Sequence, residues 1–345
     1  MNNNVKSEKM PRVSVLMSVY NGERFLKSAI ESILDQTFTD FEFLILDDGS
    51  TDSTWEILEK YADKDERVLL VRNEHNIGLT RSLNKGLRLA RGEYLARQDA
   101  DDISLPKRLE LQVKFLDMNP EVGVVGTGME IIDENGKILR LQQPPTDHES
   151  ITAELLLKNH AIGHSTVMAK LSALKEFGGY NERLPYAQDY DLWWCLSRKR
   201  KIGNLPEILV QWRDTLGSIS RKRREEQLEC IFTVSLKAIR ESLKDKTLDE
   251  EAYRRFWWAY HGYIDKLQKG DIQCLEPLWA LLASQKTKIT NISLGLKGLF
   301  YNLVRHRKWK EALALIRVLH KCLSLQLSWL QIVRSLTASL VMPEK

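Results

Sequence analysis

The chain has 345 residues, of which 43% are hydrophobic and 28% are charged, and its formal net charge at pH 7 is +4. This length accommodates one large domain or two ordinary ones, and the composition is that of a soluble globular protein. The small net charge argues against nucleic acid as a partner. No run reaches the roughly twenty apolar residues that a membrane-spanning helix requires.

The cysteines and the N-terminal residues indicate the compartment. Cys195, Cys230, Cys274 and Cys322 lack the spacing of a metal or redox motif, so we expect free thiols in a reducing environment. Residues 1–11 are polar and contain lysine, without the apolar stretch of a signal peptide. These features together predict a cytoplasmic protein.

The first 125 residues alternate between short apolar runs and amphipathic segments. Strands are predicted at 13–19, 41–46, 68–71, 94–96 and 122–125. The helices between them are predicted from apolar positions at Phe25–Leu34, from a capping box at Ser53–Glu56, from the segment that ends at Ala90, and from Pro106 to about Asn119. This alternation predicts an α/β fold with a mainly parallel sheet that helices cover on both faces.

Beyond about Gly128 the pattern changes. A hairpin is predicted around Asp133–Gly136, which separates two short apolar pairs. Helices are expected at 148–158, 171–177 and 189–199, and strands are expected at His164–Ala169 and Glu207–Trp212. After Ser220 the pattern is helical to about Val341. We therefore expect an α/β domain at residues 1–220 and an all-helical region at residues 221–345.

Two aspartate clusters follow predicted strands. Asp47-Asp48 comes after the second strand, and Asp99-Ala100-Asp101-Asp102 comes after the fourth. The carboxyl ends of neighbouring parallel strands form the ligand-binding edge of an open α/β sheet. Crowded carboxylates repel one another and need a positive partner. A hard divalent metal held by one or two carboxylates and substrate phosphates meets that need.

A set of short motifs occurs in one order along this region. The motifs are Val13–Tyr20 with Asn21-Gly22, Asp47–Asp52, Asn76–Gly78, Gly92–Tyr94, Asp99–Asp102, Pro106–Leu109 and Gln188–Trp193. Together they resemble glycosyltransferase family 2, which comprises inverting enzymes of the GT-A fold that use nucleotide-sugars. The resemblance covers roughly residues 11–220, and it implies that residues 1–220 form the catalytic domain that binds the nucleotide-sugar.

The resemblance implies a donor site at the ends of the first two strands. Ser18 and Tyr20 would line the base and ribose, and Glu23 would lie nearby. Asp48 would accept a hydrogen bond from the base edge, as a carboxylate does from a uracil or thymine N–H group. For Asp47, a role as a turn or helix cap is the alternative. The donor expected on this basis is a UDP- or dTDP-sugar.

The second cluster resembles the Asp-x-Asp motif of the family. Asp101 then corresponds to the metal ligand, and Asp99 to a contact with the ribose or with a metal-bound water. The expected ion is Mn²⁺ or Mg²⁺, which would stabilise the departing nucleoside diphosphate. Asp102 either supports the ligand or caps the following helix.

Asp189 corresponds to the catalytic base of the family. It would take the proton of the acceptor hydroxyl, although an aspartate with an ordinary pKa of about 3.9 is a poor base unless its site raises that value. Asp191, two residues further on, is the position most easily confused with it. A plain helix cap is the alternative role for Asp189.

Three further side chains are candidates by the same resemblance. His164 would border the acceptor side, or it is a satisfied buried histidine, and Trp193 would stack on a sugar, or it belongs to the core. Arg213 would neutralise the leaving diphosphate. Many relatives carry a histidine two residues after that arginine, whereas this chain has Thr215, which puts a protein ligand from this loop in doubt.

Basic and amphipathic segments suggest partners other than the donor. Residues 198–201 and 221–224 are dense basic runs, which are either solvated helix surface or a site of attraction to an anionic membrane face. The amphipathic run at 325–340 would pack on other helices, lie in a membrane interface or form a dimer seam. A peripheral contact with the inner face of the membrane and a homo-oligomer are therefore among the expectations.

The main hypothesis is a metal-dependent inverting glycosyltransferase that acts on a glycan or lipid-linked acceptor in surface polysaccharide biosynthesis. One alternative is a nucleotidyltransferase, but Tyr20–Glu23 does not form the glycine-rich basic loop that such an enzyme carries after its first strand. Another alternative is a catalytically silent scaffold whose helical tail binds partners. Donor sugar, acceptor and linkage do not follow from the sequence.

Overall fold

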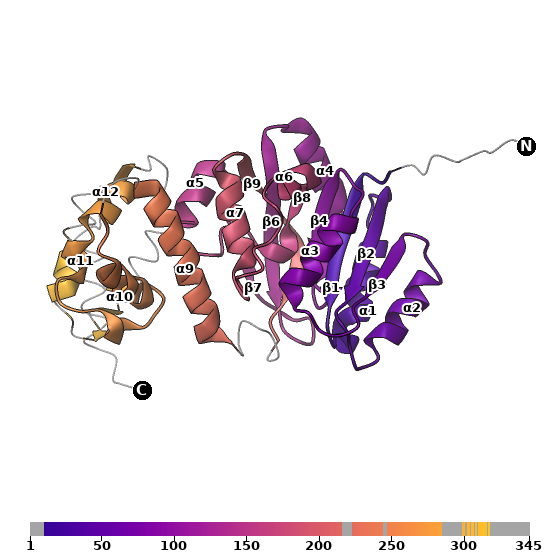
Figure 1. Cartoon of the computed structure of the whole chain (residues 1–345), viewed down its shortest axis with the longest axis horizontal. Coiled ribbons are helices and arrows are strands. Elements are labelled where there is room, and N and C mark those ends of the chain that lie inside the picture. Colours follow the sequence, from indigo (N-terminus) through magenta and orange to yellow (C-terminus); the bar gives the residue numbers. More distant parts are fainter. Residues whose placement is uncertain are drawn as a thin grey trace, which may run out of the picture. The chain divides into compact units, whose positions relative to one another are not determined.

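The computed structural model describes residues 10–215, 223–243 and 247–284, and then 299–300, 302–303, 305–306, 308, 310–315 and 317. The chain divides into two compact units (Figure 1). The first comprises residues 1–151 and 159–230, and the second comprises residues 152–158 and 231–345. The predicted division at residue 220 lies within a segment outside the described residues.

The first unit contains strands and helices in alternation. Its strands are β1 (Val13–Val19), β2 (Phe41–Asp47), β3 (Val68–Arg72), β4 (Tyr94–Gln98), β5 (Ile103–Ser104), β6 (Val122–Ile132), β7 (Ile138–Gln142), β8 (Met168–Lys170) and β9 (Lys201–Arg213). Its helices are α1 (Glu23–Leu34), α2 (Thr54–Ala62), α3 (Leu79–Leu89), α4 (Arg108–Met118), α6 (Leu171–Glu176) and α7 (Gln188–Ser197), with a short 3₁₀ turn, η1, at His164–Thr166. Helix α5 (His148–Glu154) spans the boundary between the two units.

The strands form one mixed sheet in the order β3-β2-β1-β4-β8-β6-β9-β5, with β7 paired to β6. Strands β1 to β4 pair in parallel, as do β6 and β9. Strand β8 is antiparallel to both β4 and β6, β7 is antiparallel to β6, and β5 is antiparallel to β9. The expected α/β sheet is therefore present, and its parallel character is concentrated in the half that begins the chain.

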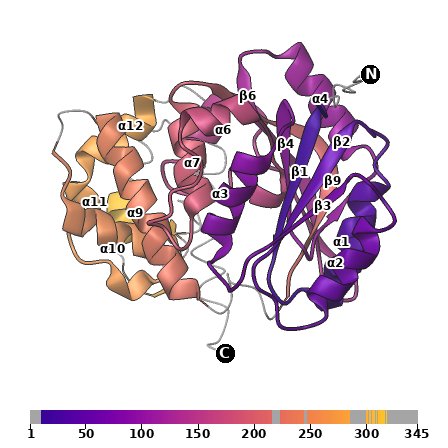
Figure 2. The same cartoon turned by 45° about the vertical axis from the view of Figure 1, so that its right-hand side comes forward.

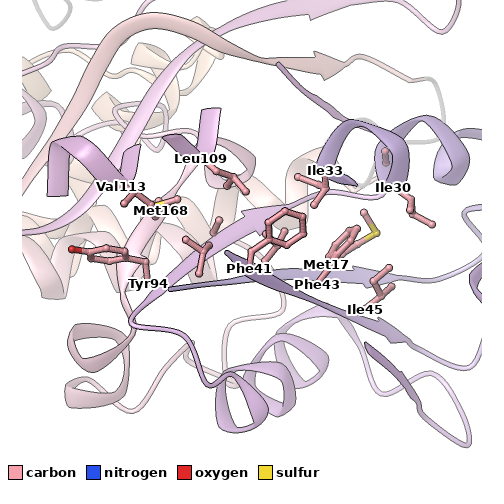
Figure 3. Packing of buried hydrophobic residues seen from close by; sticks show 14 of the residues in the cluster. Met17, Ile30, Ile33, Phe41, Phe43, Ile45, Tyr94, Leu109, Val113 and Met168 are labelled. Carbon is pink, nitrogen blue, oxygen red and sulfur yellow. The ribbon is translucent and has the colours of Figure 1, made fainter. Parts of the chain in front are cut away.

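Helices cover both faces of this sheet, as Figure 2 shows. All seven residues of β1 are buried, which is typical of a strand covered on both sides. On one face, Ile30 and Ile33 of α1 and Leu109 and Val113 of α4 pack around strand residues such as Phe43 (Figure 3). The face of a strand alternates with each residue, so Leu16 and Leu46 point to the opposite side.

Helix α3 lies against that opposite face at Gly86. A Cβ atom built on Gly86 would lie 2.2 Å from Leu16 Cδ1 and 3.0 Å from Leu46 Cδ1. Only a residue without a side chain allows the helix to approach the strands so closely. The segment between β2 and β4, which contains α3, therefore packs over one face of the sheet. The carboxyl ends of β2 and β4 lie at the same edge of the sheet.

Two local predictions are wrong. Helix α2 begins at the predicted position, but Ser53 makes no side-chain cap. Instead, the backbone N–H of Ser53 donates to Glu23 Oε2 (3.0 Å) and that of Thr54 donates to Asp52 Oδ1 (3.0 Å). The segment predicted as a strand at His164–Ala169 begins as the η1 turn and becomes strand β8 only at Met168.

The described part of the second unit is helical, as expected. Its elements are α9 (Arg224–Leu243), which begins in the first unit, α10 (Glu250–Tyr260), the 3₁₀ turn η2 (Ile264–Lys266), α11 (Asp271–Cys274) and α12 (Glu276–Ser284). Buried aromatic rings form its core, and Phe256 meets Trp279 edge-on with centroids 5.1 Å apart. The Ser235 hydroxyl lies 2.6 Å from the Tyr253 hydroxyl and donates to the carbonyl of Leu156.

No described helix is long and apolar enough to cross a membrane. The amphipathic run at 325–340 and the loop at 216–222 lie outside the described residues, and the predicted membrane and oligomer contacts of that run stay predictions. The basic run at 198–201 is largely paired on the protein's own surface. Arg200 and Lys199 contact Glu176 at 3.0 and 3.6 Å, and Lys201 contacts Glu121 at 3.6 Å.

Candidate active site

Strand β1 lies between β2 and β4, so the two aspartate clusters lie at the same edge of the sheet. In the register, Val19 pairs with Asp47, and Met17 pairs with Gln98. Adjacent strands are about 4.8 Å apart, which places the ends of β2 and β4 about two strand spacings from each other. A Cβ atom built on Gly22 would lie 3.8 Å from Ala100 Cβ, so the turn after β1 touches the turn after β4.

The turns after β1 and β2 are joined by hydrogen bonds. The Asn21 side chain accepts from the backbone N–H of Thr51 (2.8 Å), and the Asn21 N–H donates to the Ser50 hydroxyl (2.9 Å). Asn21 has a φ of 52°, a left-handed conformation that costs energy for most residues but is tolerated by asparagine. The hydrogen bonds to the turn after β2 hold Asn21 in this conformation. Tyr20, the preceding residue, is half exposed.

Asp47 and Asp48 are both buried beneath these turns. Asp47 accepts from the backbone N–H of Ser50 (3.0 Å) and pairs with Arg72 (3.0 Å), as the capping alternative predicts. Asp48 accepts from the N–H groups of Ile77 (3.0 Å) and Gly78 (2.9 Å) and from the Asn73 amide (2.8 Å). Asp48 therefore braces the 76–78 turn, and its predicted contact with the base edge stays a prediction.

The other predicted donor residues surround the same turns. Ser18 is the penultimate residue of β1 and is almost buried. Glu23 is exposed, and its carboxylate accepts from the Ser53 N–H at 3.0 Å. Ser18, Tyr20 and Glu23 therefore lie at or just after the end of β1, while each role toward a nucleotide stays a prediction.

Acidic groups gather in the second turn. Burial and repulsion from Asp99 raise the pKa of Asp101 to about 6. Asp102 is fully buried, and burial and its acidic neighbours raise its pKa well above the ordinary value. Its Oδ1 accepts from the Arg213 N–H at 2.9 Å. A site that raises the pKa of adjacent carboxylates is one that a cation would stabilise.

Asp99 is ion-paired with the buried Arg97. The guanidinium of Arg97 also donates to the carbonyls of Leu16 and Gln98. Arg97 was missed in the sequence, although a charged residue directly after the apolar Tyr94–Ala96 run is a signal, because a buried charge requires a partner. Asp99 therefore neutralises a buried cation besides facing the other carboxylates.

Asp189 lies in the first turn of α7, near enough to Asp99 for the two charges to interact. Burial raises its pKa to about 6, with repulsion from Asp99 as a smaller contribution; hydrogen bonds from the N–H groups of Tyr190 and Asp189 and from the Asn159 side chain oppose the rise. Ala187 precedes the helix with a φ of 58°. A non-glycine residue in this region is strained, and such strain clusters at functional sites.

His164, Tyr180 and Trp193 form the wall beside Asp189. His164 Nε2 lies 2.9 Å from the Tyr180 hydroxyl, and the two rings meet edge-on with centroids 5.4 Å apart. Burial and the charge of Arg97 lower the pKa of His164 to about 3, so His164 is neutral at physiological pH. Trp193 is buried against both rings, which favours the core role. No sequence pattern indicated Tyr180 or Asn159.

Arg213 lies inside the structure at the end of β9. Its Nε donates to the carbonyl of Asp101 (2.9 Å), its Nη1 donates to the carbonyls of Asp133 and Glu134, and its guanidinium carbon lies 4.5 Å from the centre of the Phe25 ring. These contacts tie the hairpin to the second acidic turn. Contact with a leaving diphosphate stays a prediction.

Asp99, Asp101 and Asp102 thus lie in one turn, Asp189 lies near enough to Asp99 for their charges to interact, and Asp48 lies under the neighbouring turn. Among the described residues, no group of three or more His, Cys, Asp or Glu side chains is arranged to hold a metal ion. A cavity of about 380 Å³ lies elsewhere, between α3 and the Gly178-Gly179 turn, and none of the predicted site residues lines it. An ion bound at the cluster would need ligands from substrate and water.

Comparison with known proteins shows the family. Residues 14–178 match the family described as Glycosyl transferase family 2. An uncharacterized glycosyltransferase of Methanocaldococcus jannaschii is 40% identical over 206 residues, which cover 59% of this chain and 71% of that protein. The Bacillus subtilis protein EpsE, named as a glycosyltransferase, is 39% identical over 290 residues, 83% of this chain and 97% of EpsE. The O-antigen biosynthesis glycosyltransferase WbnJ of Escherichia coli is 32% identical over 247 residues, 68% of this chain and 91% of WbnJ.

Solved structures share the fold. S. aureus TarS 1-349 in complex with UDP has a TM-score of 0.56 at 19% identity and covers 89% of both chains. The mannosyltransferase PcManGT from Pyrobaculum calidifontis, in complex with GDP-Man and Mn²⁺, has a TM-score of 0.53 at 19% identity, over 92% of this chain and 88% of that one. At such identities the likeness shows the fold alone, and it confirms the GT-A-type α/β architecture.

The chain belongs to glycosyltransferase family 2 and is a glycosyltransferase. This assignment favours the main hypothesis over the nucleotidyltransferase and the silent scaffold.

Proposed function

We propose that this chain is an inverting, metal-dependent glycosyltransferase that transfers a sugar from a nucleoside-diphosphate sugar to a hydroxyl group. The observation that carries this proposal is that Asp99 is an electrostatic neighbour of both Asp101 and Asp189, and that the pKa of Asp101 and the pKa of Asp189 are both raised. Such an arrangement supplies a base on one side and, on the other, carboxylates that attract a cation. The acceptor is a glycan or a lipid-linked glycan of a surface polysaccharide, a proposal supported by the similarity to the O-antigen biosynthesis glycosyltransferase WbnJ.

The donor lies across the turns after β1 and β2. Ser18 and Tyr20 line the base and ribose, and Glu23 lies nearby. Both oxygens of Asp48 already accept from the 76–78 turn, so Asp48 would accept from the base edge through a remaining lone pair. Support for a nucleotide-sugar comes from the fold neighbours, which were solved with UDP, UDP-GlcNAc and GDP-Man. The uracil or thymine preference inferred for Asp48 favours a UDP- or dTDP-sugar.

The residues of the second turn fit a divalent cation. Asp101 would hold the ion through the hard oxygen ligand that Mn²⁺ and Mg²⁺ prefer, and Asp99 would contact the ribose or a metal-bound water. The raised pKa of Asp101 supports the fit. Burial and the neighbouring Asp99 disfavour its ionised form, and a nearby positive charge would stabilise that form. When bound, the ion would supply Lewis-acid stabilisation of the leaving diphosphate, worth several kcal/mol.

The remaining chemistry belongs to Asp189. Its carboxylate takes the proton of the acceptor hydroxyl while that oxygen attacks the anomeric carbon from the face opposite the diphosphate. A new glycosidic bond forms, the bond between sugar and phosphate breaks, and the configuration inverts. The position of Asp189 at the start of α7, near the neutral His164 and Trp193, supports an acceptor site on this side.

The pH dependence of turnover tests the role of Asp189. Only the ionised carboxylate accepts a proton, so kcat at saturating donor and Mn²⁺ is expected to rise with pH through about 6 and level off above it. Below that pH, kcat falls tenfold per unit. An aspartate with the ordinary pKa would place this limb near pH 4, so a limb found there would contradict the role given to the site.

The identity of the donor can be found by thermal stabilisation. A ligand that binds only the folded state raises Tm, by an amount equivalent to about 2.7 kcal/mol at a hundredfold excess over Kd. We expect one nucleotide-sugar from a panel of UDP-, dTDP- and GDP-sugars to raise Tm with Mn²⁺ and much less with EDTA. Equal stabilisation in EDTA would contradict metal-dependent donor binding.

A further inference from the structure

A buried polar network lies behind the Asp99–Asp102 turn. Its centre consists of Gln98, the last residue of β4, and Arg108, the first residue of α4, and neither side chain has any exposed surface. Burying an unpaired guanidinium is costly unless its donors are satisfied. Among the described residues, Arg108 forms no ion pair with a carboxylate, and burial lowers its pKa to about 9.

The N–H groups of the Arg108 guanidinium instead donate to uncharged oxygen atoms. Nε donates to Gln112 Oε1 (3.2 Å), Nη1 donates to Ser104 Oγ (2.8 Å) and Gln98 Oε1 (3.2 Å), and Nη2 donates to the carbonyls of Arg97 (2.7 Å) and Val167 (3.2 Å). These oxygens belong to β4, β5, α4 and the segment before β8. Arg108 therefore holds together the elements that meet behind the acidic turn.

Gln98 connects Arg108 to the Asp99–Asp102 turn by hydrogen bonds. Its Oε1 accepts from Arg108 and from the Ser104 hydroxyl (2.6 Å), and its Nε2 donates to the carbonyls of Asp99 (3.0 Å) and Asp102 (2.9 Å). The orientation of the amide is fixed because a guanidinium only donates and can face only the amide oxygen. One amide group thus bridges both ends of the turn that carries Asp101.

We propose that Gln98 and Arg108 are positioning residues that hold the Asp99–Asp102 turn in the conformation that binds a divalent cation with the diphosphate of the donor. The inference deepens the proposed function and rests on it. Groups that orient metal ligands from behind typically contribute 10- to 100-fold in metal affinity or activity. Neither residue contacts substrate in this arrangement; each acts through the backbone of the turn.

The substitution Gln98→Glu separates this role from simple packing. A glutamate keeps the oxygen that Arg108 and Ser104 contact, and the adjacent guanidinium favours its charged form. The Nε2 donor, however, is replaced by an oxygen that faces the two carbonyls. We expect Gln98→Glu to fold and to bind Mn²⁺ together with the nucleoside diphosphate about 10- to 100-fold more weakly. Gln98→Met, which removes both halves of the contact, should weaken binding at least as much.

The measurement is calorimetric titration of Mn²⁺ with UDP, dTDP and GDP in parallel, with Mn²⁺ binding followed independently by electron paramagnetic resonance. Glu42→Gln is the matched control. Glu42 is also buried, and it accepts from Ser14 (2.6 Å) and from Arg91 (2.8 Å). It lies near the start of β2, at the edge of the sheet opposite to the acidic turns. The substitution should lower the stability and leave the affinity unchanged.

A folded Gln98→Glu protein with wild-type affinity would overturn the inference, and so would an equal loss of affinity in Glu42→Gln. If the wild-type protein itself binds none of the nucleotides with Mn²⁺, the proposed function fails. The two failures are therefore distinguishable.

Discussion

Replacing Asp189 by asparagine is expected to lower kcat by about 10²–10⁴-fold, the usual contribution of a general base. Asparagine has nearly the same shape, and its oxygen can still accept from the N–H groups at the start of α7 and from Asn159. It cannot take a proton, so acceptor attack loses its base. Donor binding, which we propose uses the turns after β1, β2 and β4, should be nearly unaffected.

The measurement is single-turnover transfer at saturating donor, together with the affinity for the nucleoside diphosphate in Mn²⁺. Asp191→Asn is the matched control, because Asp191 lies two residues further along α7 and contacts Asn181 at 3.1 Å. That variant should retain turnover. A full rate in Asp189→Asn, or a comparable loss in Asp191→Asn, would show that the base is misassigned.

The elements around the site follow from local patterns that the sequence displays. The apolar run of β1 and the spacing of Leu26, Ile30 and Ile33 in α1 depend on burial alone, which a period of two or 3.6 residues reports. The positions of Asp48 and Asp99 at one sheet edge follow from the parallel order of the strands. These features were predictable because neighbours in sequence determine them.

The contacts that shape the site were not predictable in the same way. Ser53 was expected to cap α2, but the oxygens that satisfy the first turn come from Asp52 and from Glu23, thirty residues away. The η1 turn at His164 replaces a predicted strand, and there Thr166 bonds back to the carbonyl of Gly163. Such choices depend on which oxygen reaches an N–H group in three dimensions, and a linear pattern carries no such information.

The polar network behind the Asp99–Asp102 turn was likewise not predictable from the sequence. Arg108 was recognised only as part of a motif, and Gln98 was not singled out, because their partners lie on four separate segments. The ion pair of Arg97 with Asp99 also changes the roles expected of the carboxylates in this turn. Asp99 already neutralises a buried cation and Asp102 accepts from the Arg213 N–H, which leaves Asp101 as the carboxylate of the turn that we propose holds the metal ion.

Replacing Asp101 by asparagine should therefore remove most of the metal dependence that we propose for the enzyme. The amide keeps one oxygen but loses the charge, and the stabilisation of the leaving diphosphate by several kcal/mol depends on the bound cation. At about 1.4 kcal/mol per factor of ten, a loss of about 4 kcal/mol corresponds to about a thousandfold decrease in kcat/KM. Titrating activity and nucleoside-diphosphate affinity against Mn²⁺ measures the effect directly.

Asp102→Asn provides the comparison, because Asp102 is adjacent, fully buried and bonded to the Arg213 N–H. Burial and the acidic neighbours of Asp102 raise its pKa, and an amide keeps an oxygen that can accept from the Arg213 N–H. We expect Asp102→Asn to retain the Mn²⁺ dependence that Asp101→Asn loses. If the two variants exchange these phenotypes, Asp102 is the ligand; if neither changes the response to Mn²⁺, the cation does not bind at this turn.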